Sequence, residues 1–410
     1  MNCRHCAHSL QHVFLDLGFA PPSNAYLTAA DLRAPETYFP LKLFVCERCW
    51  LVQTEDYARA DELFRSDYAY FSSTSRLWLD HAARYCQQIS ERLRLGSASH
   101  VVEVASNDGY LLKNFAAAGI PCLGIEPTAS TAAAAIALGV PTLQEFFGLE
   151  LAQRLVAEGR AAGLVLGNNV FAHVPDINDF TAGIKALLKP DGVVTLEFPH
   201  LLELIDGVQF DTVYHEHFSY LSLTTVDSIF RRAGLRIWDV QKLSTHGGSL
   251  RVFGCHAGSA RAAEPAVAAL LAEERARGLT DLSSYLGFQA LAERVKNGFL
   301  DYLLGCARAG KRVGGFGAAA KGNTLLNFAG VKPDLLPFVC DTATSKQGKF
   351  LPGSHVPILA PSALRELRPD IVLILPWNIA DELVGAHGYV KEWGGEFVTA
   401  IPELRVIRNP

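Results

Sequence analysis

The stretch Val101-Val102-Glu103-Val104-Ala105-Ser106-Asn107-Asp108-Gly109 decides the fold of this chain of 410 residues. Apolar residues that suit a buried strand lead into a turn of small residues, and a helical pattern begins directly after the turn. Further short apolar runs follow, separated by helical stretches, at residues 121–126, 163–167 and 192–198. This alternation predicts a parallel α/β sheet covered by helices.

The same loop predicts a ligand site. A strand that runs into a small-residue turn lets backbone amides approach a bound molecule before the next helix begins. Glu126 ends the following strand, where its carboxylate can accept hydrogen bonds from both hydroxyls of a ribose. The Gly-x-Gly-x-x-Gly pattern of dinucleotide sites is absent, which disfavours NAD. We therefore predict S-adenosylmethionine here, with Phe147 either packing on its adenine or belonging to the core.

Two clusters of polar side chains follow later strands of this sheet. Asn168-Asn169-Val170-Phe171-Ala172-His173 stands at the end of a strand, where open α/β sheets bind ligands. Tyr214-His215-Glu216-His217 places four polar side chains in a row within an apolar segment, and such groups are costly to bury unless they are paired. A solvated surface loop is the alternative. A histidine in an apolar pocket, oriented by a carboxylate, has the pKa range of a general base.

Four of the nine cysteines form two Cys-x-x-Cys pairs, Cys3/Cys6 and Cys46/Cys49. Both pairs lie within residues 1–60, a loop-rich segment that is too small to bury a large core and therefore needs a stabilising cross-link. Two such pairs can close a tetrahedral four-thiolate site around one zinc ion, with no position left open for water. We predict a structural zinc rather than four unrelated core cysteines.

A second α/β series follows a long helical region at residues 262–309. Residues 314–324 join its first strand to a helix, and the small residues there allow close approach of a phosphate, to which Lys321 adds charge. Residues 341–349 follow the next strand. A nucleotide-binding half and a Rossmann-like scaffold without a ligand both fit this pattern. The strands of the series are expected at residues 312–317, 336–341, 371–376 and 396–401.

The composition is that of a soluble globular protein: 49% of the residues are hydrophobic, and 37 Lys and Arg stand against 42 Asp and Glu. The net charge of −5 and the lack of a basic block give no electrostatic reason to expect nucleic acid. The sequence has no secretory signal at its start and no apolar run long enough to span a membrane. We expect a cytoplasmic protein without an obligate protein partner.

Taken together, the motifs resemble those of the S-adenosylmethionine-dependent sugar C-methyltransferases, which act on nucleotide-linked 4-keto-deoxysugars. The resemblance covers nearly the whole chain, and the combination of motifs is highly specific although each motif alone is not. It rests on the four cysteines of the two pairs and on residues 67–73, 106–109, 168–176, 197–200, 214–217, 246–251 and 320–324.

The resemblance implies a zinc-binding domain at residues 1–60, a class I Rossmann-like methyltransferase domain at 61–256 and a second Rossmann-like domain at 257–410 that helps to hold the nucleotide sugar. It implies His217 as the base, with Tyr214, Glu216, Tyr68 and His173 around the sugar. S-adenosylmethionine is expected to bind at Glu103, Ala105, Ser106, Asn107, Gly109, Glu126, Phe147, Asn168 and Asn169. The nucleotide sugar is expected to bind at Tyr70, Ser72, His200, His246, Arg251, Lys321, Asn323 and Lys346.

The expected reaction is C-methylation of a 4-keto-deoxysugar linked to thymidine diphosphate (dTDP), at C3 rather than C5. A ketone acidifies the neighbouring C–H bond, so His217, oriented by Glu216, would remove that proton, and the enolate carbon would attack the methyl group. An O- or N-methyltransferase and a non-catalytic nucleotide-sugar-binding protein are the alternatives. Ala105 replaces a glycine that is usual in the family's donor loop. If that position needs a positive φ, its Cβ costs about 1 kcal/mol, and weakened S-adenosylmethionine binding is expected.

Overall fold

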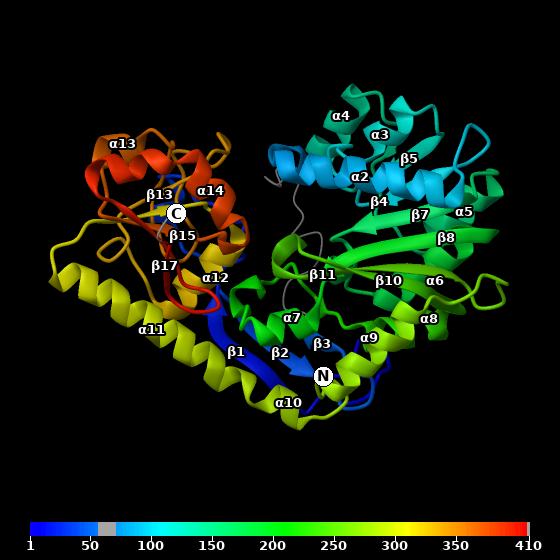
Figure 1. Ribbon diagram of the computed structural model, residues 1–410, viewed down its shortest axis with the longest axis horizontal. Coiled ribbons are helices and arrows are strands. Elements are labelled where there is room, and N and C mark those ends of the chain that lie inside the picture. Colours follow the sequence, from blue (N-terminus) through cyan, green and yellow to red (C-terminus); the bar gives the residue numbers. More distant parts are fainter. Residues whose placement is uncertain (56–70, 408–410) are drawn as a thin grey trace.

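The computed structural model describes residues 1–55 and 71–407. Figure 1 shows two large α/β lobes, with the N-terminal strands lying below and between them and the long helix α11 running beneath the C-terminal lobe. The predicted site residues Tyr68 and Tyr70 lie outside the described residues. None of the described helices is long and apolar enough to cross a membrane.

The central sheet has seven strands in the order β10-β11-β8-β7-β4-β5-β6. The strands from β8 to β6 run parallel, whereas β11 is antiparallel to both β8 and β10. The predicted parallel α/β sheet is thus confirmed, and β6, β10 and the antiparallel β11 are added to its four predicted strands. Its strands are β4 (Val101–Val104), β5 (Cys122–Ile125), β6 (Thr142–Leu143), β7 (Ala162–Asn168), β8 (Leu188–Pro199), β10 (Leu235–Leu243) and β11 (Ser249–His256).

The strand order reverses beside β4, and this reversal sets where a ligand can bind. From β4 the chain continues to β5 and β6 on one side, then returns to form β7 and β8 on the other side. Open α/β sheets bind their ligands at the carboxyl ends of the strands that flank such a reversal. The donor loop, residues 105–109, follows β4, and Asn168 and Asn169 stand at the end of β7.

Helices cover both faces of this sheet (Figure 1). Helix α2 buries Ala82, Tyr85, Cys86 and Ile89, which recur every three or four positions and so form one apolar stripe. Ser75 caps this helix, because its Oγ accepts a hydrogen bond from the backbone amide at the third following position. The helices of this lobe are α2 (Arg76–Leu93), α3 (Leu112–Ala117), α4 (Ala129–Ala137), α5 (Leu149–Ala157), α6 (Ile177–Leu187), α7 (Leu201–Asp206) and α8 (Leu223–Ala233).

The C-terminal sheet has six strands in the order β14-β13-β12-β15-β16-β17, and only the last is antiparallel to its neighbour. The four strands predicted for this part are present, and β14 and β17 are added at the edges. The strands are β12 (Val313–Phe316), β13 (Val339–Cys340), β14 (Ile358–Leu359), β15 (Ile371–Ile374), β16 (Glu396–Thr399) and β17 (Arg405–Ile407). The helices that follow β11 in the chain are α9 (Pro265–Ala276), α10 (Ser283–Leu286), α11 (Phe288–Arg308), α12 (Ala320–Ala329), α13 (Ala363–Leu367) and α14 (Ala380–Ala386).

The cysteine-bearing unit is joined to both lobes. Its strands β1 (His12–Ala20), β2 (Phe39–Val45) and β3 (Val52–Thr54) form an antiparallel sheet whose fourth strand, β9 (Ser219–Tyr220), comes from the segment after His217. On the other side, the Phe14 ring stacks on Phe288 of α11, with ring centroids 4.6 Å apart. The domain boundaries expected at residues 60 and 256 stay predictions.

Short 3-10 helices occupy several loops: η1 (Asp31–Arg33), η2 (Ser72–Thr74), η3 (Phe171–His173), η4 (Phe210–Thr212), η5 (Thr245–Gly247), η6 (Trp377–Ile379) and η7 (Gly388–Trp393).

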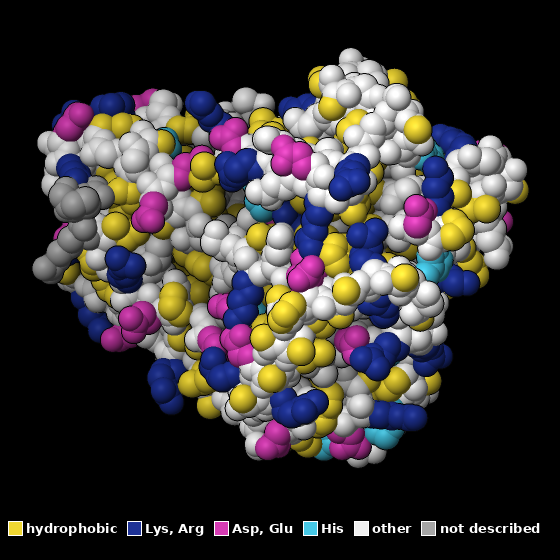
Figure 2. Space-filling view, turned by 45° about the vertical axis from the view of Figure 1, so that its right-hand side comes forward, with side chains coloured by type: hydrophobic (Ala, Val, Ile, Leu, Met, Phe, Trp, Pro, Cys, Tyr) yellow, Lys and Arg dark blue, Asp and Glu magenta, His cyan; other side chains and the backbone are white. Residues whose placement is uncertain are grey.

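The surface carries charges of both signs. Figure 2 shows Lys and Arg side chains interspersed with Asp and Glu side chains over one face of the molecule. This distribution agrees with the near balance of 37 basic and 42 acidic residues.

Candidate active site and zinc centre

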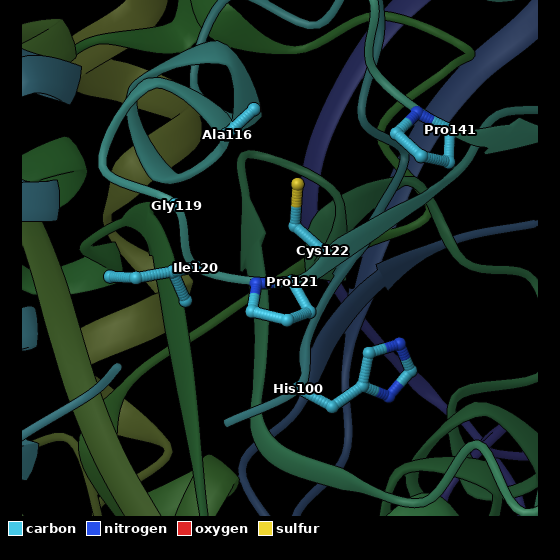
Figure 3. Close-up of a pocket in the computed structure, with 7 residues that line it drawn as sticks. All are labelled: His100, Ala116, Gly119, Ile120, Pro121, Cys122 and Pro141. Atoms are coloured by element: carbon cyan, nitrogen blue, oxygen red, sulfur yellow. The ribbon is translucent and has the colours of Figure 1, made fainter. Parts of the chain in front are cut away.

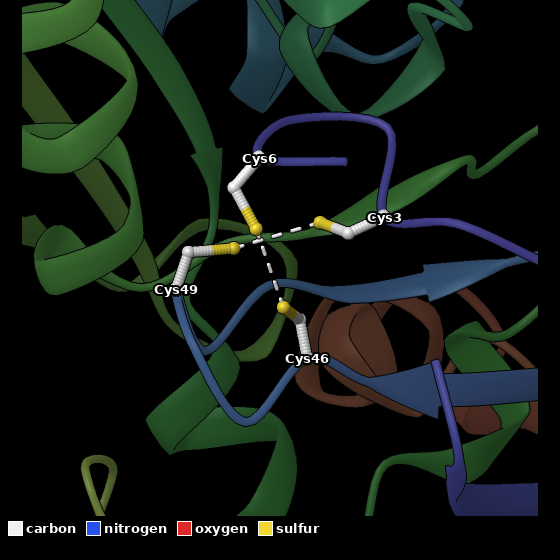
Figure 4. Close-up of side chains that lie close together, drawn as sticks. All are labelled: Cys3, Cys6, Cys46 and Cys49. Carbon is white, nitrogen blue, oxygen red and sulfur yellow. Dashed lines mark hydrogen bonds between the residues drawn. The ribbon is translucent and has the colours of Figure 1, made fainter. Parts of the chain in front are cut away.

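The two cysteine pairs converge on one point (Figure 4). The Sγ atoms of Cys3, Cys6, Cys46 and Cys49 all lie within 4.8 Å of one another. The distance is 3.5 Å between the Sγ atoms of Cys3 and Cys49, and also between those of Cys6 and Cys46. Gln53 Nε2 donates a hydrogen bond to Cys3 Sγ at 3.2 Å. Zinc–sulfur bonds of about 2.3 Å in a tetrahedron place the sulfurs about 3.8 Å apart, so the four thiolates fit a closed zinc site.

The donor loop leaves β4 with left-handed backbone at three positions. The angle φ is +56° at Ala105, +48° at Asn107 and +76° at Gly109. Ala105 thus has the positive φ angle that was expected to strain its Cβ, because a residue with a Cβ is strained at such an angle. At Gly109 a Cβ would also lie 3.1 Å from Cβ of Ala135 in helix α4, so a side chain there would require helix α4 to shift slightly.

Buried polar atoms that have no partner among the described residues gather at the carboxyl end of β4. Within the described residues, neither carboxylate oxygen of Glu103 makes a hydrogen bond, nor do Ser106 Oγ and one oxygen of Asp108. Burial raises the pKa of Glu103 well above its usual range, and the nearby carboxylates of Glu126 and Asp108 raise it further. Buried groups of this kind normally have partners, so their presence here fits a polar molecule bound beside the donor loop.

Glu126 is held in a fixed orientation after β5. Its Oε2 accepts a hydrogen bond from the Asn107 amide and its Oε1 one from the Thr128 amide, both at 2.9 Å. Each carboxylate oxygen has two lone pairs, so both oxygens keep capacity for a further donor. The arrangement fits a carboxylate that receives the two hydroxyls of a ribose.

Asn168 is the last residue of β7, and Asn169 follows it. Asn169 lies close to His246, which belongs to the loop between β10 and β11. Asn168 Nδ2 and Asn169 Oδ1 are buried and have no partner in the described part of the chain. Asn169 Nδ2 lies 2.9 Å from His246 Nε2. The His246 ring in turn packs edge-on against Trp78 of α2, with ring centroids 5.2 Å apart. The structure therefore brings these three predicted ligand-binding residues together.

Ser72 and Phe147 lie at the border of this region. The Ser72 amide donates a hydrogen bond to Asn107 Oδ1 at 2.9 Å, which joins η2 to the donor loop. Phe147 is half-buried and packs edge-on against Phe180 of α6, with ring centroids 5.4 Å apart. Phe147 thus contacts the core, and its contact with adenine stays a prediction.

His217 lies within a buried aromatic cluster. Its ring centroid is 3.9 Å from that of Tyr214, 4.6 Å from that of His173 and 6.0 Å from that of Tyr220. Its Nδ1 lies 3.0 Å from the carbonyl oxygen of Thr212, to which it donates a hydrogen bond in the neutral ring. Burial, followed by the neighbouring His173, lowers the pKa of His217 well below its usual range. The neutral ring keeps its lone pair on Nε2, which is the form that a general base needs.

Glu216 does not orient the imidazole of His217, and the sequence-based expectation is wrong on this point. Its Oε1 accepts a hydrogen bond from Asn24 Nδ2 at 3.0 Å. Its Oε2 is buried and has no partner among the residues that the structure describes. Burial raises the pKa of this carboxyl group. The carbonyl of Thr212 orients His217 instead, and a backbone carbonyl leaves no signal in a sequence because only the path of the loop brings it to the ring.

Two of the predicted substrate residues are paired with buried carboxylates. His200 Nε2 lies 2.8 Å from an oxygen of Glu274 in α9, and both side chains are fully buried. Arg251 forms an ion pair with Glu197, and His81 Nε2 lies 2.9 Å from the same carboxylate. Burial acts to raise the pKa of Glu197, but the hydrogen bond from His81 and the charge of Arg251 outweigh it and lower the pKa to about 2. The pair of Arg251 and Glu197 joins β11 to β8, and the pair of His200 and Glu274 joins the end of β8 to α9.

Lys321 lies where the C-terminal lobe meets the loop of His217. Its Nζ donates a hydrogen bond to Asn378 Oδ1 at 2.6 Å and lies 4.5 Å from the ring centroid of Trp377. Burial lowers the pKa of Lys321, while the charge of Asp211 acts in the opposite direction. Trp377 Nε1 donates to Asp211 Oδ2 at 2.8 Å, which fastens η6 to η4. Trp377 is not among the predicted site residues, because nothing in its local sequence indicates this partner.

Asn323, near the start of α12, is bonded to the N-terminal unit, and Lys346 is bonded to the glycine-rich loop after β12. Asn323 Nδ2 donates a hydrogen bond to the Ser23 carbonyl at 2.6 Å. Lys346 Nζ donates to the Ala318 carbonyl at 2.9 Å, and the Tyr26 hydroxyl donates to the same carbonyl at 2.6 Å. The structure therefore places a loop of the N-terminal unit between the glycine-rich loop and the cluster of His217.

A separate hollow of about 390 Å³ lies at the opposite ends of the strands (Figure 3). His100 precedes β4 and Pro121 precedes β5, so the hollow opens at the amino ends of these strands, away from the donor loop. In Figure 3 the thiol of Cys122 and the imidazole of His100 do not point toward each other. This hollow is not part of the site described above. It is lined by His100, Ala116, Gly119, Ile120, Pro121, Cys122 and Pro141.

Comparison with known protein families matches three consecutive parts of the chain. Residues 3–64 match a zinc binding domain, residues 78–240 a methyltransferase domain and residues 244–402 a C-methyltransferase C-terminal domain. The C-methyltransferase NovU of Streptomyces niveus is 38% identical over 405 residues, which cover 99% of this chain and 96% of that protein.

Solved structures resemble part of the chain more distantly. Protein PH0226 of Pyrococcus horikoshii is 13% identical with a TM-score of 0.38, and the match covers 46% of this chain and 95% of that one. Magnesium protoporphyrin IX methyltransferase of Synechocystis is 16% identical with a TM-score of 0.33, over 43% of this chain and 81% of that one. By its family matches and its full-length relative, the chain belongs to the S-adenosylmethionine-dependent C-methyltransferases, with S-adenosylmethionine and a structural zinc as its cofactors.

Proposed function

We propose that the protein methylates a dTDP-linked 4-keto-deoxysugar at the carbon beside the ketone, with C3 favoured over C5. The observation that supports this proposal most is the buried His217, whose Nδ1 donates to the Thr212 carbonyl, so that the neutral ring keeps its lone pair on Nε2. An unactivated sugar carbon is not a nucleophile, so methylation at carbon requires a base that first makes a carbanion. Methylation of a hydroxyl or an amine needs no acidic C–H bond.

In the proposed reaction, His217 Nε2 removes the proton beside the ketone, and the electrons of that C–H bond move onto the ketone oxygen as an enolate. Tyr214 and His173, whose rings lie against that of His217, are proposed to donate hydrogen bonds to this oxygen. Burial lowers the pKa of His173 to about 4, while a hydrogen bond with the Glu216 backbone acts in the opposite direction, so its ring is neutral at pH 7. Tyr68 is proposed as a further donor.

S-adenosylmethionine, when bound, supplies an electrophilic methyl group to the enolate carbon. Glu126 is proposed to hold the ribose of this cofactor, since both of its oxygens are fixed by backbone amides. Glu103 and Ser106 offer buried acceptors to the other polar groups, and Asn168 and Asn169 border the same end of the sheet. Alignment of the two reacting carbons within this site supplies much of the remaining rate.

The nucleotide side of the substrate is proposed to lie along the glycine-rich loop of the C-terminal lobe. Lys321 and Lys346 supply positive charge there, and Asn323 is bonded to the N-terminal unit. His246 links this side to the cofactor through Asn169. Tyr70 and Ser72 are proposed to complete the sugar site, whereas His200 and Arg251 are proposed to support it through their buried carboxylate partners.

Two measurements on the wild-type protein test this proposal. With dTDP-4-keto-deoxysugars and S-adenosylmethionine, the product should gain one methyl group on carbon, and NMR should place it at C3. In heavy water, with demethylated cofactor in place of the methyl donor, the substrate should exchange the proton beside the ketone for deuterium. A product methylated at oxygen or nitrogen, without exchange at carbon, would establish the O- or N-methyltransferase alternative. Binding of the nucleotide sugar with neither exchange nor transfer would indicate a non-catalytic protein.

A further inference from the structure

The segment at residues 21–27 of the zinc-binding unit lies between two parts of the candidate site. On one side, Asn24 Nδ2 donates its hydrogen bond to Glu216 Oε1 at 3.0 Å. On the other side, the Ser23 carbonyl accepts from Asn323 and the Tyr26 hydroxyl donates to the Ala318 carbonyl, each at 2.6 Å. Asn24 is therefore held in place by contacts that are independent of its own bond to Glu216.

The two oxygens of Glu216 have different surroundings because of Asn24. An amide N–H group can only donate, so Asn24 commits Oε1 to the role of acceptor. Oε2 is buried but has no partner among the described residues, and Glu216 as a whole is only 1% exposed. A buried carboxylate oxygen without a partner fits a donor from a bound molecule, such as a sugar hydroxyl.

We propose that Asn24 is a positioning residue for the reaction: it fixes Glu216 through Oε1 and presents Oε2 to a hydroxyl group of the sugar. The inference rests on the proposed function, in which Glu216 belongs to the sugar site. It gives the zinc-binding unit a part in the active site, since Asn24 and the zinc ligands belong to the same N-terminal unit.

The electrostatic surroundings of Glu216 agree with this role. Burial raises its pKa, and the hydrogen bonds that lower it come from its own backbone and from the side chain and backbone of Asn24. The titratable groups that face it from other elements are Tyr26, Tyr220 and the imidazole of His173, all neutral at pH 7 because burial raises the pKa of both tyrosines and lowers that of the histidine. Loss of the donor on Asn24 should therefore raise the pKa of Glu216 further.

Asn24→Leu is the variant of choice, because it keeps the shape of the side chain and removes the donor without adding charge. With the full-length zinc-loaded protein, carboxyl-labelled glutamate followed by carbon NMR should show Glu216 titrating at a higher pH than in the wild type, with Glu216→Gln to assign its signal. Turnover at neutral pH should fall about tenfold or more, the scale for losing a hydrogen bond to a charged group, and recover as the pH rises. Affinity for S-adenosylmethionine should stay unchanged.

Tyr26→Phe is the matched control, since it loosens the same segment but leaves the bond between Asn24 and Glu216 intact. It should keep the wild-type titration of Glu216. Asn24→Ser, whose hydroxyl is too short to span the contact, should repeat the shift if the leucine variant does not fold. An unchanged titration and unchanged turnover in these Asn24 variants would overturn the inference while the proposed function stands. A wild-type protein that shows no exchange at carbon would overturn the proposed function, and the role of Asn24 with it.

Discussion

Ala105 carries a Cβ in a backbone conformation that favours glycine, with φ at +56°. We predict that Ala105→Gly raises the free energy of unfolding by about 1 kcal/mol, because the strain of the Cβ is removed. Ala133→Gly, an exposed position inside helix α4, is the matched control and should lower stability by a similar amount, because glycine weakens a helix. Chemical denaturation measures both. A glycine at position 105 that destabilises the protein would show that the loop is not strained there.

Buried histidines near the candidate base make stability depend on pH. Burial lowers the pKa of His173 to about 4, against 6.5 in the unfolded chain. Between these values the unfolded state binds more protons at this residue, so its contribution to stability falls as the pH drops from 6.5 to 4. Asp211, whose pKa burial raises to about 6, acts in the opposite direction between pH 6 and 3.8.

We predict that His173→Gln loses less stability than the wild type between pH 7 and pH 4.5, because the variant has no imidazole to protonate on unfolding. Urea denaturation at the two pH values gives the difference in the free energy of unfolding for each protein. Equal losses in both proteins would mean that His173 accepts protons equally well in the folded state.

At the scale of single elements, four strands of each large sheet were predicted from their apolar runs, and the structure places them within a few residues of the expected bounds, whereas β6, β10, β11 and β17 were not predicted. The two-residue strands β9 and β14 were not predicted. Such short strands have no pattern of their own, and they exist because β3 and β13 offer free edges to which they can bind. The zinc site was predictable because the spacing of its thiols carries the geometry of the metal site.

The zinc-bearing turns hold the small sheet of β1, β2 and β3 together. We predict that the purified protein carries one zinc ion per chain. Cys46→Ser should release the zinc and lower the melting temperature, because the unit loses the metal that cross-links its two cysteine pairs. Elemental analysis and thermal denaturation measure both effects. Cys122→Ser is the control, since this thiol lies outside the zinc centre and should leave the zinc content unchanged. Full zinc content in the Cys46 variant would contradict the four-thiolate site.

At the scale of the whole molecule, the candidate site is assembled from three distant parts of the chain. The loop of His217 contacts Asn24 of the N-terminal unit, and it is fastened through Asp211 to Trp377 of the C-terminal lobe. The resemblance of motifs indicated most of the residues that the structure gathers at the candidate site. It could not indicate Asn24 or Trp377, because contacts between residues so far apart in the sequence are set by the packing of the lobes.

The central claim is that the protein makes an enolate with His217 as the base, and proton exchange measures this step without methyl transfer. In heavy water and without S-adenosylmethionine, the wild type should exchange the proton beside the ketone of a dTDP-4-keto-deoxysugar. His217→Asn should abolish both exchange and methyl transfer while S-adenosylmethionine binding stays nearly intact. Tyr214→Phe should slow both by about 10²-fold, the scale for losing one donor to the oxyanion. His387→Asn, a half-buried histidine of the C-terminal lobe, should change neither. Exchange at the wild-type rate in His217→Asn would contradict the account and move the base to His173 or His215.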